Sequence, residues 1–155
     1  MTATLLPTTP DRTRVGDSPG APAQPHKGRF RLCLAALFWV LPLLVLGAMT
    51  SSTGSGMAFA DWPLANGQLW PEMQLDGYLE HVHRFAGGGL GVLVLWLAIW
   101  SLAKDPVRWR RWLTITLLGI VVVQGLIGGI GVLHDTPVLS SATHGVLAQG
   151  VVALL

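Results

Sequence analysis

The sequence predicts an all-α integral membrane protein that folds as an antiparallel four-helix transmembrane bundle. Hydrophobic residues make up 51% of the 155-residue chain and charged residues only 12%, about half the share usual in soluble domains. Long apolar segments alternate with short polar loops, and an apolar stretch of about 20 residues can cross a bilayer as a helix. The seven tryptophans and nineteen glycines fit this class, because both residues are frequent in membrane helices and at their interfaces.

Residues 1–28 are predicted to be a disordered cytoplasmic tail, because they are rich in Pro, Thr, Ser, Gly and Ala with scattered charge. Residues 29–155 are predicted to form a single membrane domain. Its first apolar segment, about 32–49, also resembles a signal peptide, since basic residues precede it and small residues lie near its end. We favour a retained helix, because the region ahead of the segment is unusually long for a signal peptide.

Each of the four apolar segments is predicted to be a membrane span. The predicted spans are residues 32–49, 78–102, 112–133 and 137–155. Pro137 is a good first helical residue, because the N–H that proline lacks would have no partner there in any case. The chain is still apolar at Leu155, so we expect it to be truncated at its C-terminus.

The charges of the loops predict the orientation of the bundle. Residues 50–77 contain three acidic residues and neither Lys nor Arg, whereas residues 103–111 contain four basic residues. Basic loops stay in the cytoplasm, so the N-terminus and residues 103–111 are predicted to be cytoplasmic. This clustering of basic residues indicates membrane topology rather than nucleic-acid binding, and the lipid bilayer is the expected surrounding.

Polar side chains concentrate where the second span begins, in the stretch LEHVHRF. Glu80 and His83 are three residues apart and therefore lie on one face of a helix. His81 is two positions from His83 and points to nearly the opposite side, so it is a bystander or an indirect contributor. Ionisable groups are costly near hydrocarbon, which makes Glu80, His83 and Arg84 candidates for a functional site.

A second histidine, His144, is predicted at a matching depth in the fourth span. A rise of about 1.5 Å per residue places His83 and His144 roughly 8 and 10 Å from the outer ends of their spans. Two neutral imidazoles on different helices are what ligation of a haem iron from both sides requires. Arg84 could pair with a haem propionate.

Other interpretations of these histidines remain open. A lone histidine near a helix end is usually an interfacial polar residue. Zinc normally needs three or four protein ligands, and the sequence offers no clear third ligand on these faces. His134 lies at the outer end of the third span, and the sequence does not assign it a role.

Four stretches together resemble the N-terminal half of haem A synthase. They are the loop TSSTGSGMAFADWPLANGQLWPE, the E-H-V-H-R stretch, QGLIGGIGVL in the third span and SATHGVLAQ in the fourth. The resemblance covers about residues 32–155. The E-x-x-H-R element alone is moderately specific, whereas its combination with this loop and a histidine in the fourth span is highly specific.

The resemblance implies an oxidoreductase that oxidises a methyl group of haem O to the formyl group of haem A by successive hydroxylations, for cytochrome oxidase biogenesis. It implies an eight-helix architecture of two similar four-helix halves, each with a histidine pair. His83 and His144 match the pair associated with the substrate haem O, and Glu80 matches the glutamate implicated in catalysis. The other half of such enzymes holds a haem B that carries electrons.

The sequence contains only one such half, so the activity of this chain alone is left open. Two copies could pair as a homo-oligomer, and haem O synthase and an electron donor are expected partners. The expected location is a bacterial-type plasma membrane, or the mitochondrial inner membrane of a eukaryote. The alternatives are a bis-histidine electron-transfer cytochrome without substrate oxidation and a non-haem structural or assembly protein. Glu80 counts against the cytochrome, because electron transfer needs no carboxylate beside the ligand.

Overall fold

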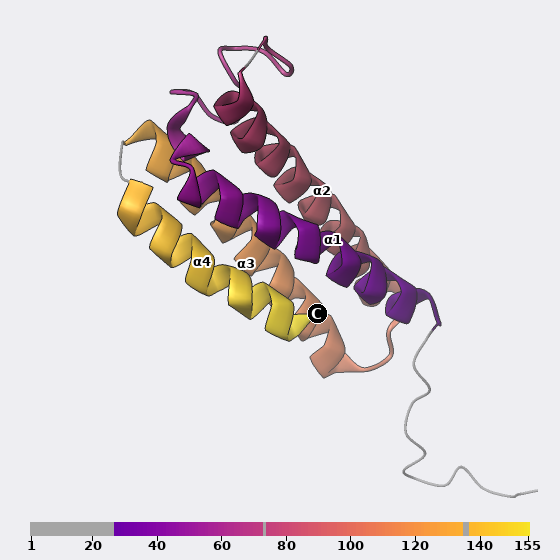
Figure 1. Ribbon diagram of the computed structural model, residues 1–155. Coiled ribbons are helices and arrows are strands. Elements are labelled where there is room, and N and C mark those ends of the chain that lie inside the picture. The colour runs from indigo at the N-terminus through magenta and orange to yellow at the C-terminus, as the bar shows by residue number, and fades with distance from the viewer. Residues whose placement is uncertain (1–26, 73, 135–136) are drawn as a thin grey trace, which may run out of the picture.

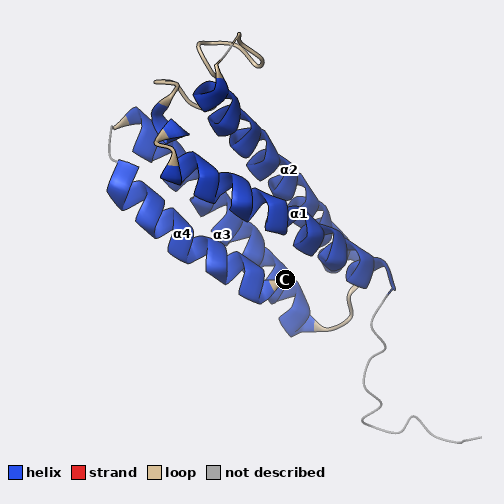
Figure 2. Cartoon of the chain, in the orientation of Figure 1, coloured by secondary structure: helices blue, strands red, loops and turns tan. Residues whose placement is uncertain are grey.

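The computed structural model describes residues 27–72, 74–134 and 137–155, and its described part is built from helices and loops (Figure 2). Residues 1–26 of the predicted tail lie outside it, whereas Lys27 and Gly28 are the first residues of a helix. The elements are α1 (Lys27–Ser52), the short 3-10 helix η1 (Ser55–Met57), α2 (Leu75–Lys104), α3 (Arg108–Leu133) and α4 (Pro137–Leu154). The predicted all-α class is confirmed, and each helix contains all or nearly all of one predicted span.

The four helices form an antiparallel bundle (Figure 1). Each helix packs against the next one in the chain, and α1 also contacts α4. The end of α1 lies near the start of α2 at one end of the bundle, and α2 meets the start of α3 at the other (Figure 1). Because neighbours in sequence are also neighbours in space, α2 and α4 occupy opposite corners and face each other across the bundle.

Three of the helices are long and apolar enough to cross a membrane, namely α1, α2 and α3. The chain is therefore an integral membrane protein. The described side chains of α4, Val138–Leu154, are apolar but fall short of that length. The prediction that α4 also crosses the membrane stays a prediction.

The buried hydrophobic core is small and lies in the half of the bundle where α2 leads into α3. Its members are Ala36, Val40, Leu90, Val94, Leu97, Leu117 and Val151. Many larger apolar side chains point outward; Phe38, for example, is 67% exposed and Val92 65% exposed. Exposed apolar surface over the whole length of the helices is suited to contact with lipid chains rather than water.

An ion pair fastens the end of the bundle at which α2 leads into α3. Arg29 on α1 lies 3.6 Å from the carboxylate of Asp105, whose side chain is fully buried in the turn between α2 and α3. The other carboxylate oxygen of Asp105 accepts a hydrogen bond of 3.0 Å from the backbone N–H of Val107. This contact gives the first turn of α1 a partner, which explains why the helix begins ahead of the predicted apolar span.

Candidate functional site

The structure brings His83 of α2 and His144 of α4 together across the bundle. Their ring centroids are 6.2 Å apart and the ring planes are inclined by 66°. The two residues are far apart in the sequence. The structure nevertheless places both rings at one level of the bundle, as the matching depths predicted for them require. Neither ring is fully exposed, and each is only partly covered by its neighbours.

His144 is oriented by the backbone of α3. Its Nδ1 atom lies 3.1 Å from the carbonyl oxygen of Gln124. A carbonyl can only accept, so Nδ1 carries the proton and donates, which leaves Nε2 with a free lone pair. Ligating histidines are commonly held by such a bond from the second ring nitrogen.

His83 has a buried ring nitrogen, Nδ1, without a hydrogen-bond partner. The ring lies against Gly47 of α1, where an added Cβ atom would come within 2.9 Å of His83 Cε1. On the other side, a Cβ at Gly128 of α3 would lie 3.8 Å from the ring of His144. Two facing imidazoles, with an unpartnered Nδ1 on His83, a free lone pair on Nε2 of His144 and glycines beside them, form a donor set that fits a haem iron.

A zinc site would need a third ligand close to these two. In residues 27–72, 74–134 and 137–155, no group of three or more His, Cys, Asp or Glu side chains is placed to hold a metal ion. The described residues therefore offer two histidines here, fewer than the three or four protein ligands that a zinc site normally has. The side-chain oxygen of Gln124 is also buried without a hydrogen-bond partner.

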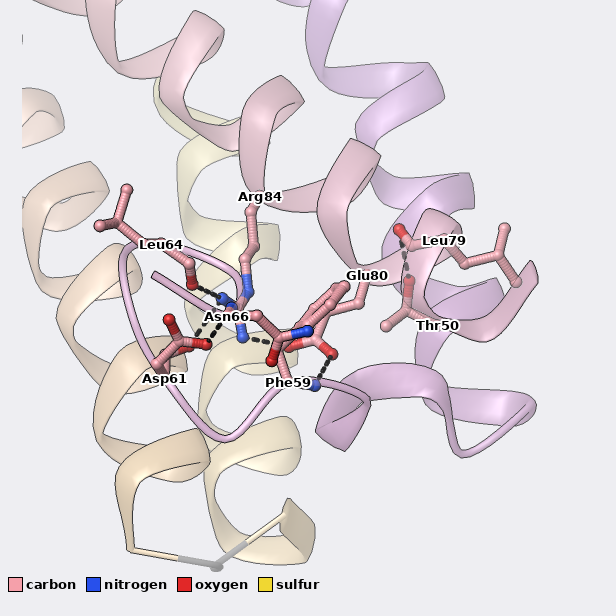
Figure 3. A network of polar contacts seen from close by, with 8 residues as sticks. All are labelled: Thr50, Phe59, Asp61, Leu64, Asn66, Leu79, Glu80 and Arg84. Carbon is pink, nitrogen blue, oxygen red and sulfur yellow. Dashed lines mark hydrogen bonds and ion pairs between the residues drawn. The ribbon is translucent and has the colours of Figure 1, made fainter. Parts of the chain in front are cut away.

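Glu80 is buried, with 3% of its surface exposed, and both of its carboxylate oxygens accept bonds (Figure 3). Oε1 forms an ion pair with Arg84 one turn along α2. Oε2 accepts a hydrogen bond of 3.1 Å from the backbone N–H of Phe59, in the loop between α1 and α2. No hydrogen bond joins the carboxylate to His83 or His144 among the described residues, so its link to the histidine pair is its place one turn away on α2.

Arg84 binds the same loop with a second nitrogen. Its Nη1 atom donates hydrogen bonds of 2.8 Å to the carbonyl oxygens of Asp61 and Leu64, and its guanidinium lies over the ring of Phe59 at 5.8 Å from the centroid. We call residues 58–68 the strap, because these bonds fasten this stretch to α2. These bonds use three of the five N–H donors of the guanidinium, so the predicted contact of Arg84 with a propionate would have to use the remaining two.

A tight turn forms the tip of the strap. Asn66 and Gly67 both have positive φ angles, 52° and 71°, a combination that Asn-Gly sequences adopt readily. The carboxylate of Asp61 accepts hydrogen bonds of 2.8 Å from the backbone N–H groups of both residues. The bond from Gly67 is the main reason why the pKa of the Asp61 carboxyl is lowered from its ordinary value. The carboxylate that accepts the hydrogen bonds of the turn therefore stays charged to a lower pH than an ordinary aspartate.

The strap also reaches α3 through Trp62. A Cβ atom added at Gly129 would lie 2.6 Å from the Trp62 ring, so only glycine leaves room for the indole there. Gly129 neighbours Gly128, which lies beside His144. The space beside Gly129 is thus occupied by a tryptophan of the loop rather than by another helix.

The other two histidines of the described chain lie away from the pair. His81 is 2% exposed, and the rings of Phe59, Trp70 and Phe85 surround it at centroid distances of 6.2, 5.0 and 4.8 Å. Both of its ring nitrogens are buried without a hydrogen-bond partner. His134 is an exposed residue at the C-terminal end of α3.

The fold and the site define a helical-bundle membrane protein with two facing histidines between opposite helices. The chain belongs to the cytochrome oxidase assembly protein family, COX15-CtaA, which it matches over residues 30–155. It is 37% identical over 107 residues to a heme A synthase of Bacillus licheniformis, covering 68% of this chain and 35% of that protein. It is 34% identical over 122 residues to a heme A synthase of Shouchella clausii, covering 77% of this chain and 40% of that protein.

A relative with a different name also matches. A protoheme IX farnesyltransferase of Halobacterium salinarum is 32% identical over 121 residues, which cover 78% of this chain and 26% of that protein. The resemblance predicted from the sequence is thus confirmed, and the chain spans 35–40% of the length of the two heme A synthases described above. No solved structure matches the chain.

Proposed function

We propose that the chain is a haem A synthase unit that binds haem O between His83 and His144 and takes part in oxidising one of its methyl groups to a formyl group. The observation that carries this proposal is the pair of imidazoles that face each other from α2 and α4, 6.2 Å between centroids. The two relatives named heme A synthase support the reaction. As the substrate, haem O brings the iron that the two histidines would ligate.

The residues of the chain would hold the substrate and place its reacting methyl group. Ligation from both sides fixes the plane of the macrocycle, and a fixed geometry removes much of the entropic barrier to reaction at one position. Glu80 lies one turn from His83 and presents two acceptor oxygens. We assign to this carboxylate the uptake of protons, or the stabilisation of positive charge, as the methyl group is oxidised.

The partners follow from the same proposal. The oxidation would need an external oxidant such as dioxygen, and the electrons that hydroxylation also consumes would pass from an electron donor through a haem B in a second four-helix unit, supplied by further chain or by a second copy of this one. The similarity to a protein named protoheme IX farnesyltransferase supports haem O synthase as the source of the substrate. The acidic loop would face outward and the N-terminus the cytoplasm, in a bacterial-type plasma membrane or a mitochondrial inner membrane.

The porphyrin bound to the purified chain tests this function. The full 155-residue chain would be produced in cells that make haem O, and its extracted pigment identified by mass. We expect haem O, a hydroxylated form of it or haem A. Haem B alone would contradict the proposal and favour an electron-transfer cytochrome, and a colourless but correctly inserted protein would favour a structural or assembly role.

A further inference from the structure

The strap crosses the end of the bundle at which the histidine pair lies. Its bonds to α2 are made at Glu80 and Arg84, on either side of His83 in the sequence. Its contact with α3 is made at Gly129, next to the glycine that lies beside His144. Figure 3 shows the strap in front of the helices, with the side chains of Glu80 and Arg84 pointing into it.

No other basic residue near Arg84 in the sequence could replace it as the partner of Glu80. It is the only Lys or Arg between Arg31 and Lys104, and none follows Arg111. Its side chain is 12% exposed and that of Glu80 4%, so removing the guanidinium would leave a buried carboxylate without a cation. An unpaired buried charge is strongly unfavourable, so Arg84 has to stay beside Glu80. In that position it also bonds the strap.

We infer that Arg84 is a positioning residue, which clamps the strap over the outer end of the histidine site, and that Trp62 seated on Gly129 is the second fastening point. Arginine suits this task, because its planar guanidinium can donate to two loop carbonyls and to a carboxylate at once, whereas the single ammonium of lysine offers no such fork. The closed strap would keep water from reaching the site through the outer loop. That the covered site holds haem rests on the proposed function, whereas the clamp itself does not.

The clamp can be tested without any haem by measuring thiol labelling. Ala65, within the strap, is 0% exposed, so a thiol introduced by Ala65→Cys should react slowly with a bulky maleimide. The background would be Cys33→Ala, which removes the only native cysteine. Ser101→Cys gives a second reporter in the inner half of α2, where the native side chain is also 0% exposed.

Arg84→Met and Arg84→Lys should each raise the labelling rate at position 65 about tenfold or more, because either change opens the strap locally. The rate at position 101 should stay low, which separates local release from unfolding. A fast rate at both positions would contradict a positioning role, since it would mean that Arg84 holds the whole bundle together. Arg84→Lys with the native labelling rate would also contradict the inference, because charge alone would then be sufficient.

The contact with α3 has its own matched pair of variants. Gly129→Ala should release the strap, whereas Gly125→Ala, one turn away with open space around it, should leave labelling unchanged. In a Trp62→Ala background, Gly129→Ala should add little, because the clashing ring is already gone. Equal labelling in the Gly129→Ala and Gly125→Ala variants would overturn this fastening point. If the labelling results hold and the purified chain is colourless, the proposed function fails while the clamp stands.

Discussion

Replacing Glu80 by glutamine is expected to abolish most haem A production and to destabilise the end of the bundle that carries the strap. The side chain keeps its shape, but its amide nitrogen, which is a donor, can face the Arg84 guanidinium, which is also a donor. Arg84 then loses the carboxylate that it pairs with directly, and breaking such a buried pair costs about 3–5 kcal/mol. The measurement is haem A content per mole of inserted protein, together with the denaturation midpoint of the purified chain.

Two further variants separate the roles of Glu80. Glu80→Asp retains the charge on a shorter side chain, so it should recover part of the stability. Glu72→Gln is a control, because Glu72 lies just ahead of α2 and is exposed, and it should change neither quantity. If Glu80→Gln kept full haem A production at normal protein levels, the carboxylate would have no part in the reaction.

Replacing Gly47 by alanine is expected to empty the haem site although Gly47 is not a ligand. The added Cβ would lie 2.9 Å from Cε1 of His83, which is closer than carbon atoms pack, so the imidazole has to turn. The lost alignment should weaken haem binding by about tenfold or more, a loss of about 1.4 kcal/mol in binding free energy, and so lower the haem bound per protein when haem is limiting. Optical absorbance at the Soret band, per mole of purified protein, measures it.

Gly119→Ala is the matched control for this change. Gly119 lies in the inner half of α3, and nothing is within 4 Å of a Cβ built there. Alanine in place of a helical glycine should then raise stability slightly, by up to about 1 kcal/mol, and leave haem content unchanged. Native haem content in the Gly47→Ala protein would mean that the His83 ring does not lie where the structure places it when haem is bound.

The helices and the histidine pair could be predicted from the sequence because both depend on regular geometry. Apolar length alone locates the spans, and a fixed rise per residue allows His83 and His144 to be placed at one depth. The start of α1 could not be predicted, because it depends on Arg29 reaching a carboxylate far away in the chain. Hydropathy contains no information about that contact.

The contacts of the strap with the helices could not be predicted from the sequence for a similar reason. Arg84 donates to the backbone carbonyls of Asp61 and Leu64, and every residue type offers such a carbonyl, so no side-chain pattern marks the partner. The Asn66–Gly67 turn has a recognisable sequence signal, but a turn signal does not say which helix the loop will contact. The seat of Trp62 on Gly129 likewise depends on the tertiary arrangement.

The ligation of one haem by His83 and His144 is tested most directly by optical spectra of the purified chain and its His83→Ala and His144→Ala variants. His134→Ala serves as the control, because that imidazole is exposed at the end of α3. We predict a low-spin haem spectrum in the native and His134→Ala proteins, and a changed or absent Soret band in each of the other two. An unaltered Soret band after loss of either His83 or His144 would contradict the account.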